Sequence, residues 1–252
     1  MALVDGLPSV ILSNVAQLIK QKVPAKTAPL VEQFADLLYS NISTLDLDHR
    51  NDSDMYGATL SLWNSLNDHQ DNTPVIKVFN PQVSKHGWKS SHTVIEVIIA
   101  DMPFLVDSLR IALNRLGLSP HLMLNSPINI IRDNNNQITQ LAAAANKALR
   151  STSVEAVFFI EVDRQTDQKV LDEITKEIHS VVNDIAITVD DWQAMRTRLS
   201  ELITETAEAK LPCSINDHDD TLEFLKWMLN DNFTLLGYRS YDVKALKGDM
   251  SL

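Results

Sequence analysis

The amino-acid sequence predicts an α+β fold in three parts: N-terminal helices, then an antiparallel sheet packed with helices, then a helical linker that leads to a further strand. Three observations predict it. Apolar residues recur about every 3.6 positions in the first part of the chain, they alternate with a period of two after Pro74, and a long helical pattern follows Asp167. These changes place segment boundaries at 1–73, 74–210 and 211–252.

The N-terminal segment is expected to form helices. Pro8 is placed to begin the first one, because proline is tolerated in the first turn of a helix. Residues 23–27 interrupt the pattern, and apolar positions spaced for one helical face resume over 28–42. A polar, acidic stretch at 44–54 then precedes a third apolar helical face over 55–66.

Short strands and two helices alternate over the middle segment. A strand rich in β-branched residues at 92–100 leads into one helix, and a buried strand at 154–162 leads into the other. This order is typical of a split βαβ, ferredoxin-like sandwich. In chain order we expect strands at 75–79 and 92–100, a helix that ends at Gly117, strands at 121–124, 128–131, 138–143 and 154–162, and a helix over 167–209.

The C-terminal segment is expected to hold a linker at 211–220, a short helix at 222–229 and an alternating strand at 233–243. Asp219 or Asp220 is placed to cap that helix. The strand has no partner in the remaining sequence, and an unpaired strand leaves its backbone donors and acceptors unused. We therefore interpret it as the first strand of a further domain in a longer protein.

The charge and the glycine pattern exclude several classes of function. The 252 residues carry a formal net charge of −11, without a run of Lys or Arg, so nucleic acids and anionic membrane surfaces would be repelled. The six glycines are dispersed, which excludes both standard glycine-rich nucleotide loops. We expect no nucleic-acid partner, no membrane partner and no cofactor in this stretch of chain.

Cysteine content and the N-terminal sequence indicate a location. The only cysteine, Cys213, cannot form an internal disulfide, and a lone cysteine is typical of proteins in the reducing cytosol. The sequence has neither a signal-peptide pattern nor the run of about 20 apolar residues that a membrane span needs. We therefore expect a cytoplasmic protein.

Candidate metal and catalytic groups have the wrong spacing. The acidic loop 46–54 has Arg50 where an EF-hand needs an oxygen ligand. His86 and His92 are the nearest pair of histidines, and no zinc-binding motif includes them. Cys213 would need a histidine base beside it to act as a nucleophile. We expect no metal site and no catalytic residue.

The most informative local pattern is the turn after the strand at 92–100. Asp101 is placed to cap the next helix, and Pro103 to occupy its first turn, so a structural interpretation accounts for both. A functional interpretation stays open, because the N–H groups at a helix N-terminus attract a small carboxylate such as that of an amino acid. The candidate residues for effector binding or for an interface are Asp101, Met102, Pro103, Phe104 and Leu105.

Residues 94–105 resemble the opening strand, turn and helix of an ACT domain, a small-molecule-sensing module whose usual pattern is an apolar strand followed by Asp-x-Pro-Gly-Leu. Phe104 stands where that pattern has glycine. Three longer stretches, 54–63, 101–117 and 223–239, together resemble the N-terminal region of the large bacterial NAD-specific glutamate dehydrogenases. This resemblance covers nearly the whole chain.

The resemblance implies a parent enzyme several times longer than this chain, which oxidises L-glutamate to 2-oxoglutarate and ammonia and reduces NAD. It also implies that the active-site lysine, the catalytic aspartate and the dinucleotide-binding fold lie beyond Leu252. The present chain would then be a segment for allosteric regulation and assembly of a homo-oligomer, without catalytic residues. Two alternatives stay open: a purely structural oligomerisation module, and a stand-alone ACT-like sensor of amino acids.

Overall fold

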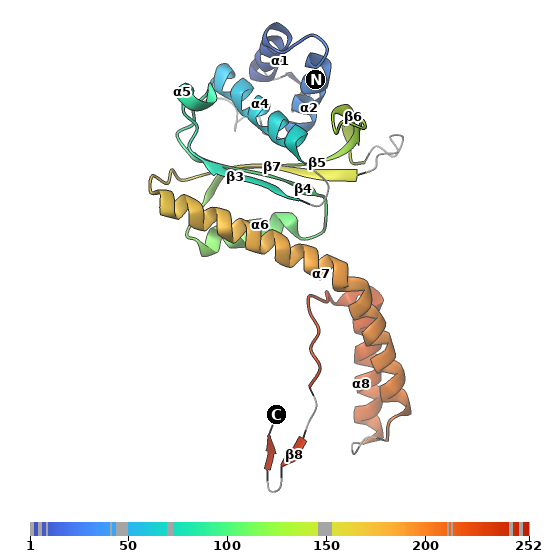
Figure 1. The fold of residues 1–252 in the computed structure, drawn as a ribbon. Coiled ribbons are helices and arrows are strands. Elements are labelled where there is room, and N and C mark those ends of the chain that lie inside the picture. The colour runs from blue at the N-terminus through green and yellow to red at the C-terminus, as the bar shows by residue number, and fades with distance from the viewer. Residues whose placement is uncertain are drawn as a thin grey trace. The chain divides into compact units, whose positions relative to one another are not determined.

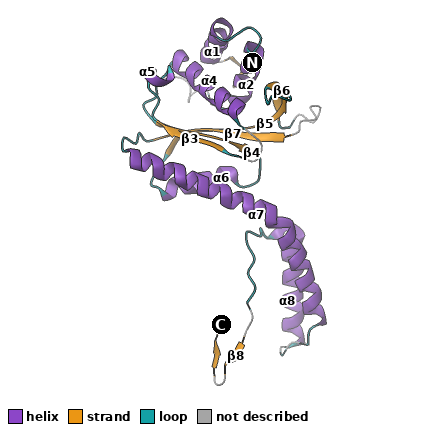
Figure 2. Cartoon of the chain, in the orientation of Figure 1, coloured by secondary structure: helices purple, strands orange, loops and turns teal. Residues whose placement is uncertain are grey.

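The computed structural model describes residues 10–40, 42–43, 50–69, 73–145, 153–210, 212 and 214–241, together with the backbone of short strands at 3–4, 7–8, 244–246 and 249–251. The chain divides into two compact units, Met1–Val182 and Asn183–Leu252. The first unit contains a central sheet with helices on both faces, and the second contains helices and a small hairpin (Figure 2).

A five-stranded sheet forms the centre of the first unit. Its strands are β3 (Val75–Phe79), β4 (Thr93–Ala100), β5 (Pro120–Arg132), β6 (Ile138–Ala143) and β7 (Ser153–Val162). They lie in the order β3-β4-β7-β5-β6, and every neighbouring pair is antiparallel (Figure 1). Helix α6 (Leu105–Arg115) connects β4 to β5 with β7 between them, which is a split βαβ unit. The predicted α+β class is confirmed.

β5 is longer than the sequence predicts. The two expected strands at 121–124 and 128–131 form one strand of 13 residues that passes through Pro127. Proline is tolerated there because the β5–β6 ladder begins only at Ile128, so Pro127 lies at its end; on that side its carbonyl oxygen accepts from the Ala144 N–H at 3.2 Å, and no ladder bond from its nitrogen is needed. The turn at 133–136 and the hairpin partner β6 follow as expected.

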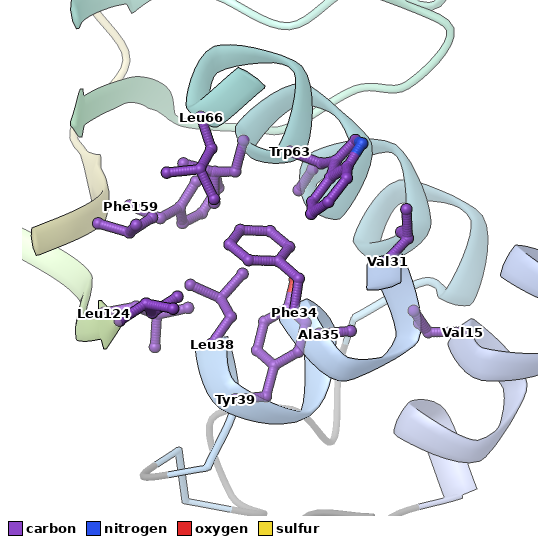
Figure 3. Packing of buried hydrophobic residues seen from close by; sticks show 14 of the residues in the cluster. Val15, Val31, Phe34, Ala35, Leu38, Tyr39, Trp63, Leu66, Leu124 and Phe159 are labelled. Carbon is purple, nitrogen blue, oxygen red and sulfur yellow. The ribbon is translucent and has the colours of Figure 1, made fainter. Parts of the chain in front are cut away.

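Two helices, α2 (Ala28–Leu38) and α4 (Asp52–Asp68), pack on one face of the sheet, and α1 (Val10–Lys22) packs on these two helices. The apolar residues of the three helices and of this sheet face form one core, in which Phe34 lies against Trp63 with ring centroids 5.7 Å apart (Figure 3). α4 begins where the Asn51 side chain accepts hydrogen bonds from two backbone N–H groups of its first turn. The short helix α5 (Val83–His86) lies in the connection between β3 and β4.

The other face of the sheet is covered by α6 and by the first turns of α7 (Gln168–Glu208) (Figure 1). Four residues of α6, namely Leu105, Leu109, Ala112 and Leu113, are buried, as are Leu171, Ile174, Ile178 and Val182 of α7. The odd-numbered apolar residues of β4 and the even-numbered ones of β7 supply the sheet side of this core. Alternate side chains of each strand thus enter two separate cores.

The N-terminal prediction needs one correction. Pro8 does not begin a helix: it lies in the two-residue strand β2 (Leu7–Pro8), which pairs with β1 (Leu3–Val4), and α1 starts at Val10. The fixed φ of proline suits an extended edge strand as well as the first turn of a helix, so the presence of Pro8 alone does not distinguish a strand from a helix start.

In the second unit, the C-terminal part of α7 packs antiparallel to α8 (Ile215–Trp227). Arg196 donates a hydrogen bond to the Leu229 carbonyl oxygen at 2.9 Å, and His218 Nε2 lies 2.9 Å from the Thr206 carbonyl oxygen. α7 is one continuous helix of 41 residues through the aspartates at 190–191. A turn of π-helix, η1 (Met228–Asn232), ends α8, where Asp231 has a positive φ of 61°.

Two predictions for the second unit are wrong in detail. The helix begins at Ile215, and its cap is Ser214, which accepts a hydrogen bond from the Asp217 N–H, rather than Asp219 or Asp220. Residues 233–241, expected within a strand, have no regular secondary structure. The strands described in this unit, β8 (Lys244–Leu246) and β9 (Asp249–Ser251), pair with each other, so neither takes 233–241 as its partner. Residues 242–243 lie outside the described part.

Candidate functional site

The turn between β4 and α6 differs from its predicted geometry. α6 starts at Leu105, its N-cap position is Phe104, and no side chain in the described part of the chain caps it. Asp101 instead continues the ladder with β7, because its backbone N–H donates to the Val154 carbonyl oxygen at 2.8 Å. The predictions that Asp101 caps the helix and that Pro103 lies in its first turn are therefore wrong. The helix begins too late for either role.

Phe104 explains the late start. Its φ is +73°, in the left-handed region that glycine adopts without penalty and other residues adopt at a cost of about 1–2 kcal/mol. This is the position at which the ACT pattern has glycine. The Phe104 side chain is 42% exposed, whereas its neighbour Leu105 is buried and anchors the start of α6. Met102 is half-buried, and Asp101 and Pro103 are exposed. Loss of water around its carboxyl raises the pKa of Asp101.

The face of the sheet toward α4 carries three buried glutamates that the sequence analysis did not single out. Glu96 lies in β4, and Glu155 and Glu161 lie in β7. The sequence itself contains a sign of these glutamates, because each one interrupts a strand whose other residues are mostly apolar. A buried carboxylate needs partners, and each of the three has them.

Glu96 is held by α4. The hydroxyls of Ser61 and Ser65 donate to its two carboxylate oxygens at 2.5 and 2.7 Å, and Lys77 donates to Ser65 Oγ at 2.9 Å. Burial raises the pKa of Glu96, and the two serine hydroxyls and the charge of Lys77 oppose that rise only in part.

Glu155 forms a buried ion cluster at the C-terminal end of α4. Arg132 approaches it at 3.0 Å and His69 at 2.8 Å. Arg132 also donates to the Leu66 carbonyl oxygen at 2.8 Å, and Asn136 donates to the carbonyl oxygen of His69 at 3.1 Å. The cluster thereby ties the β5–β6 turn to the C-terminal end of α4.

Glu161 lies at the wall of a cavity of about 400 Å³ between α4 and the sheet. Its side chain is 3% exposed, and it accepts hydrogen bonds from Arg50 at 2.6 Å and from Ser90 at 3.0 Å. The cavity has an apolar wall and a polar rim. The apolar wall consists of Tyr39, Met55, Ala58, Trp88, Leu122, Leu124 and Phe159, and the other lining residues are Arg50, Asn51, Asp54, Lys89, Ser90, Ser91, His92 and Glu161.

Two histidines meet beside this cavity. The rings of His92 and His121 lie 4.4 Å apart, and His121 Nε2 is 2.7 Å from the Asp163 carboxylate. His86 lies elsewhere, where its ring packs on Phe79 at 5.0 Å, and burial lowers its pKa. Among the residues that the structure describes, no group of three or more His, Cys, Asp or Glu side chains is arranged to hold a metal ion.

Other residues considered in the sequence analysis lie outside the described part of the chain. These are Cys213 and the loop residues 44–49, which include most of the acidic stretch. Within the described helices, none combines the length and the apolar character required to cross a bilayer.

The antiparallel sheet, the split βαβ connection and the β4–α6 turn together define an ACT-like α+β domain. A family model confirms this class: "Glutamate dehydrogenase, ACT1 domain" matches residues 34–178, and the chain belongs to that family. The matched range contains the whole sheet, the 101–105 turn and every residue that lines the cavity beside Glu161.

Curated relatives carry the name NAD-specific glutamate dehydrogenase. The protein of Halomonas elongata is 35% identical over 244 residues, which are 96% of this chain and 15% of the relative. The protein of Pseudomonas aeruginosa is 33% identical over 225 residues, 89% of this chain and 14% of the relative. That of Mycobacterium tuberculosis is 27% identical over 146 residues, 58% of this chain and 9% of the relative. The chain thus spans about a seventh of the length of the first two relatives.

Proposed function

We propose that this chain is the N-terminal regulatory and assembly segment of a large NAD-dependent glutamate dehydrogenase and carries no dehydrogenase chemistry of its own. The observation that carries the proposal is the family match over 34–178. It is supported by the relative named NAD-specific glutamate dehydrogenase from Halomonas elongata, in which the matching region is 15% of the length. The parent would convert L-glutamate, NAD and water to 2-oxoglutarate, ammonia and NADH. NAD would bind to other domains of that parent, in the cytoplasm.

Exposed apolar side chains support the assembly part of this proposal. Nine of the thirteen large apolar residues that are exposed in the described chain lie in the second unit, although that unit is much the shorter. Phe224 and Trp227 stack on α8 with ring centroids 6.0 Å apart, and both are about half exposed. Surfaces of this kind mark sites of contact with other proteins or domains. Their partners would be other domains of the parent or further copies in a homo-oligomer.

The 101–105 turn supports an interface rather than an effector site. Phe104 presents an exposed aromatic ring from a backbone conformation that costs free energy, and such strain is retained where a contact depends on it. The uncapped N-terminus of α6 beside it also suits the carboxylate of an amino-acid effector. We place the interface first because a phenylalanine side chain occupies the position where glycine would let a ligand approach the backbone.

Two measurements test the proposal. The chain is incubated with L-glutamate and NAD, with a full-length NAD-specific glutamate dehydrogenase as positive control, and NADH absorbance is followed. We expect no NADH from the chain, and glutamate-dependent formation would contradict the proposal. Sedimentation of the chain over a range of concentrations then tests assembly. A chain that stays monomeric and does not bind the remaining domains of the parent would contradict that part.

A further inference from the structure

The middle of α7 is packed differently from its two ends. Val182 and Ile185 are buried before it, and Met195 and Leu199 are buried after it, whereas none of residues 186–194 is buried. These residues span about two and a half turns at 3.6 residues per turn. A helix that rests on a core buries side chains in every turn or two, so α7 crosses this stretch without a core beneath it.

The side chains that would continue the buried face stay partly in solvent. Thr188 and Val189 are half-buried, and Ile187 and Trp192 are 51% and 42% exposed. The stretch borders a groove of about 530 Å³ whose other side is formed by residues 236–238, which have no regular secondary structure. Most of the stability of a helix in a protein comes from the packing of its apolar face. Packing therefore contributes little to the helix over 186–194.

The composition of the same stretch disfavours a helix. Ile187, Thr188 and Val189 are β-branched residues in succession, and such side chains lose rotamer freedom in a helix. Asp190 and Asp191 follow, and an aspartate competes with the helix by bonding to nearby backbone groups. By contrast, residues of high helix propensity (Leu, Met, Glu, Lys and Arg) make up more than half of 169–177 and of 195–202. Loose packing and low propensity thus coincide in the middle of α7.

We propose that residues 186–194 are a hinge within α7, at which the helix opens reversibly while the helical stretches on either side stay intact. The hinge follows closely after the boundary between the two compact units, which falls between Val182 and Asn183. Hinges are short segments that absorb a change of backbone angles, so that the rigid parts beside them move as bodies. Opening would let the second unit change its orientation without unfolding of the ACT-like domain.

The inference goes beyond the proposed function, because it concerns a motion of this chain and is measurable whether or not the parent is a dehydrogenase. Most of the exposed large apolar side chains in the described chain lie in the second unit. A hinge would allow that surface to meet a partner over a range of orientations. Local opening of this kind occurs between microseconds and seconds.

Hydrogen exchange of the chain, read by mass spectrometry, tests the opening. Each amide inside α7 is protected by its bond to the carbonyl group four residues before it, and it exchanges when that bond opens. We expect the amides of 188–194 to exchange at least about tenfold faster than those of 174–182 and 197–204, after correction for the intrinsic rate of each residue. Those two stretches serve as internal controls in the same helix.

Matched variants test the cause of the opening. Thr188→Ala/Asp190→Ala/Asp191→Ala raises helix propensity at three positions of the hinge, and it should slow exchange of 188–194 by at least about tenfold. Thr188→Val/Asp190→Asn/Asp191→Asn changes the same positions and removes the same charges, but its new residues have nearly the propensity of those they replace. This control variant should exchange like the unmodified chain.

Distances between spin labels test the motion itself. In a Cys213→Ser background, labels at Ser119→Cys and Ser200→Cys report one exposed position in each unit. We expect a broad distribution of distances between them, and a narrower one in the triple alanine variant. Labels at Ser119→Cys and Gln140→Cys, both exposed and both in the first unit, are the control pair and should give a narrow distribution.

Three results would overturn the inference. One is equal protection of 188–194 and of the two flanking stretches. Another is a distance distribution between positions 119 and 200 as narrow as that of the control pair. The third is exchange that slows equally in the alanine and control variants, or in neither, because low helix propensity would then not be the cause of the opening.

Discussion

Gly57 of α4 lies so close to Trp88 that a β-carbon at position 57 would come within 2.3 Å of Trp88 Cβ. The nearest atom is the β-carbon of Trp88, which is attached directly to its backbone, so a change of side-chain rotamer in this buried residue cannot relieve the contact. Close packing against Trp88 therefore requires glycine at position 57. In the interior of a helix, glycine otherwise lowers stability by about 1 kcal/mol relative to alanine.

Gly57→Ala should therefore lower the free energy of unfolding by about 1–3 kcal/mol, because overpacking outweighs the gain in helix propensity. Urea denaturation measures it. The matched control is Asn64→Ala, on the exposed side of the same helix, which should leave stability unchanged or raise it slightly. A Gly57→Ala variant as stable as the control would contradict the close packing.

Phe104→Gly should be more stable than Phe104→Ala by about 1 kcal/mol. Both variants lose the same ring, but only glycine adopts the φ of +73° without strain, and this benefit exceeds its greater freedom in the unfolded chain. Thermal and urea unfolding of the two variants give the difference directly. If alanine proved the more stable, the left-handed conformation at position 104 would be wrong.

Arg132→Met should cost about 3–5 kcal/mol, because it leaves the buried Glu155 carboxylate without its main cation. The exposed ion pair of Arg115 with Glu177 supplies the comparison: Arg115→Met should cost less than about 1 kcal/mol. Adding Glu155→Gln to Arg132→Met should restore part of the loss. Equal effects at both arginines would show that the Glu155 cluster contributes no more than a surface pair.

The raised pKa of Glu96 predicts a defined pH dependence. Between the ordinary glutamate pKa of 4.5 and its higher value in the folded protein, the folded state holds a proton that the unfolded state has lost. This contribution to stability is present at low pH and decreases as the pH rises through that window. Glu96→Gln should remove it, so the variant gains stability relative to the unmodified chain as the pH rises above about 4.5. A stability difference that does not change with pH would contradict the shift.

Local patterns in the sequence are sufficient to predict most of the first unit. The β-branched run of β4, the apolar run of β7 and the helix that ends at Gly117, whose φ is +72°, are all found. The conformation of each of these elements is determined mainly by residues close to one another in the sequence, which is the information that periodicity records. The start of α6 at Leu105 was missed because it depends on the conformation of the single residue Phe104, which no periodicity records.

The cavity and the buried glutamates could not be predicted in the same way. The cavity joins residues from Tyr39 to Glu161, and its shape follows from how α4 lies on the sheet. Glu155 is paired with His69 across 86 positions of sequence, a distance at which spacing carries no information. At residues 233–241 the sequence pattern predicted too much. Their apolar residues alternate as in a strand, but a strand forms only where another strand pairs with it, and these residues have no regular secondary structure.

The position of β3 has a consequence for synthesis of the protein. The sheet edge beside β4 is filled by a strand that precedes β4, whereas in the βαββαβ order that edge strand would follow the second helix. All five strands, from Val75 to Val162, are therefore translated before α7. The nascent chain can complete its hydrogen-bonded sheet without waiting for the second unit, which shortens the time that open strand edges are exposed to aggregation.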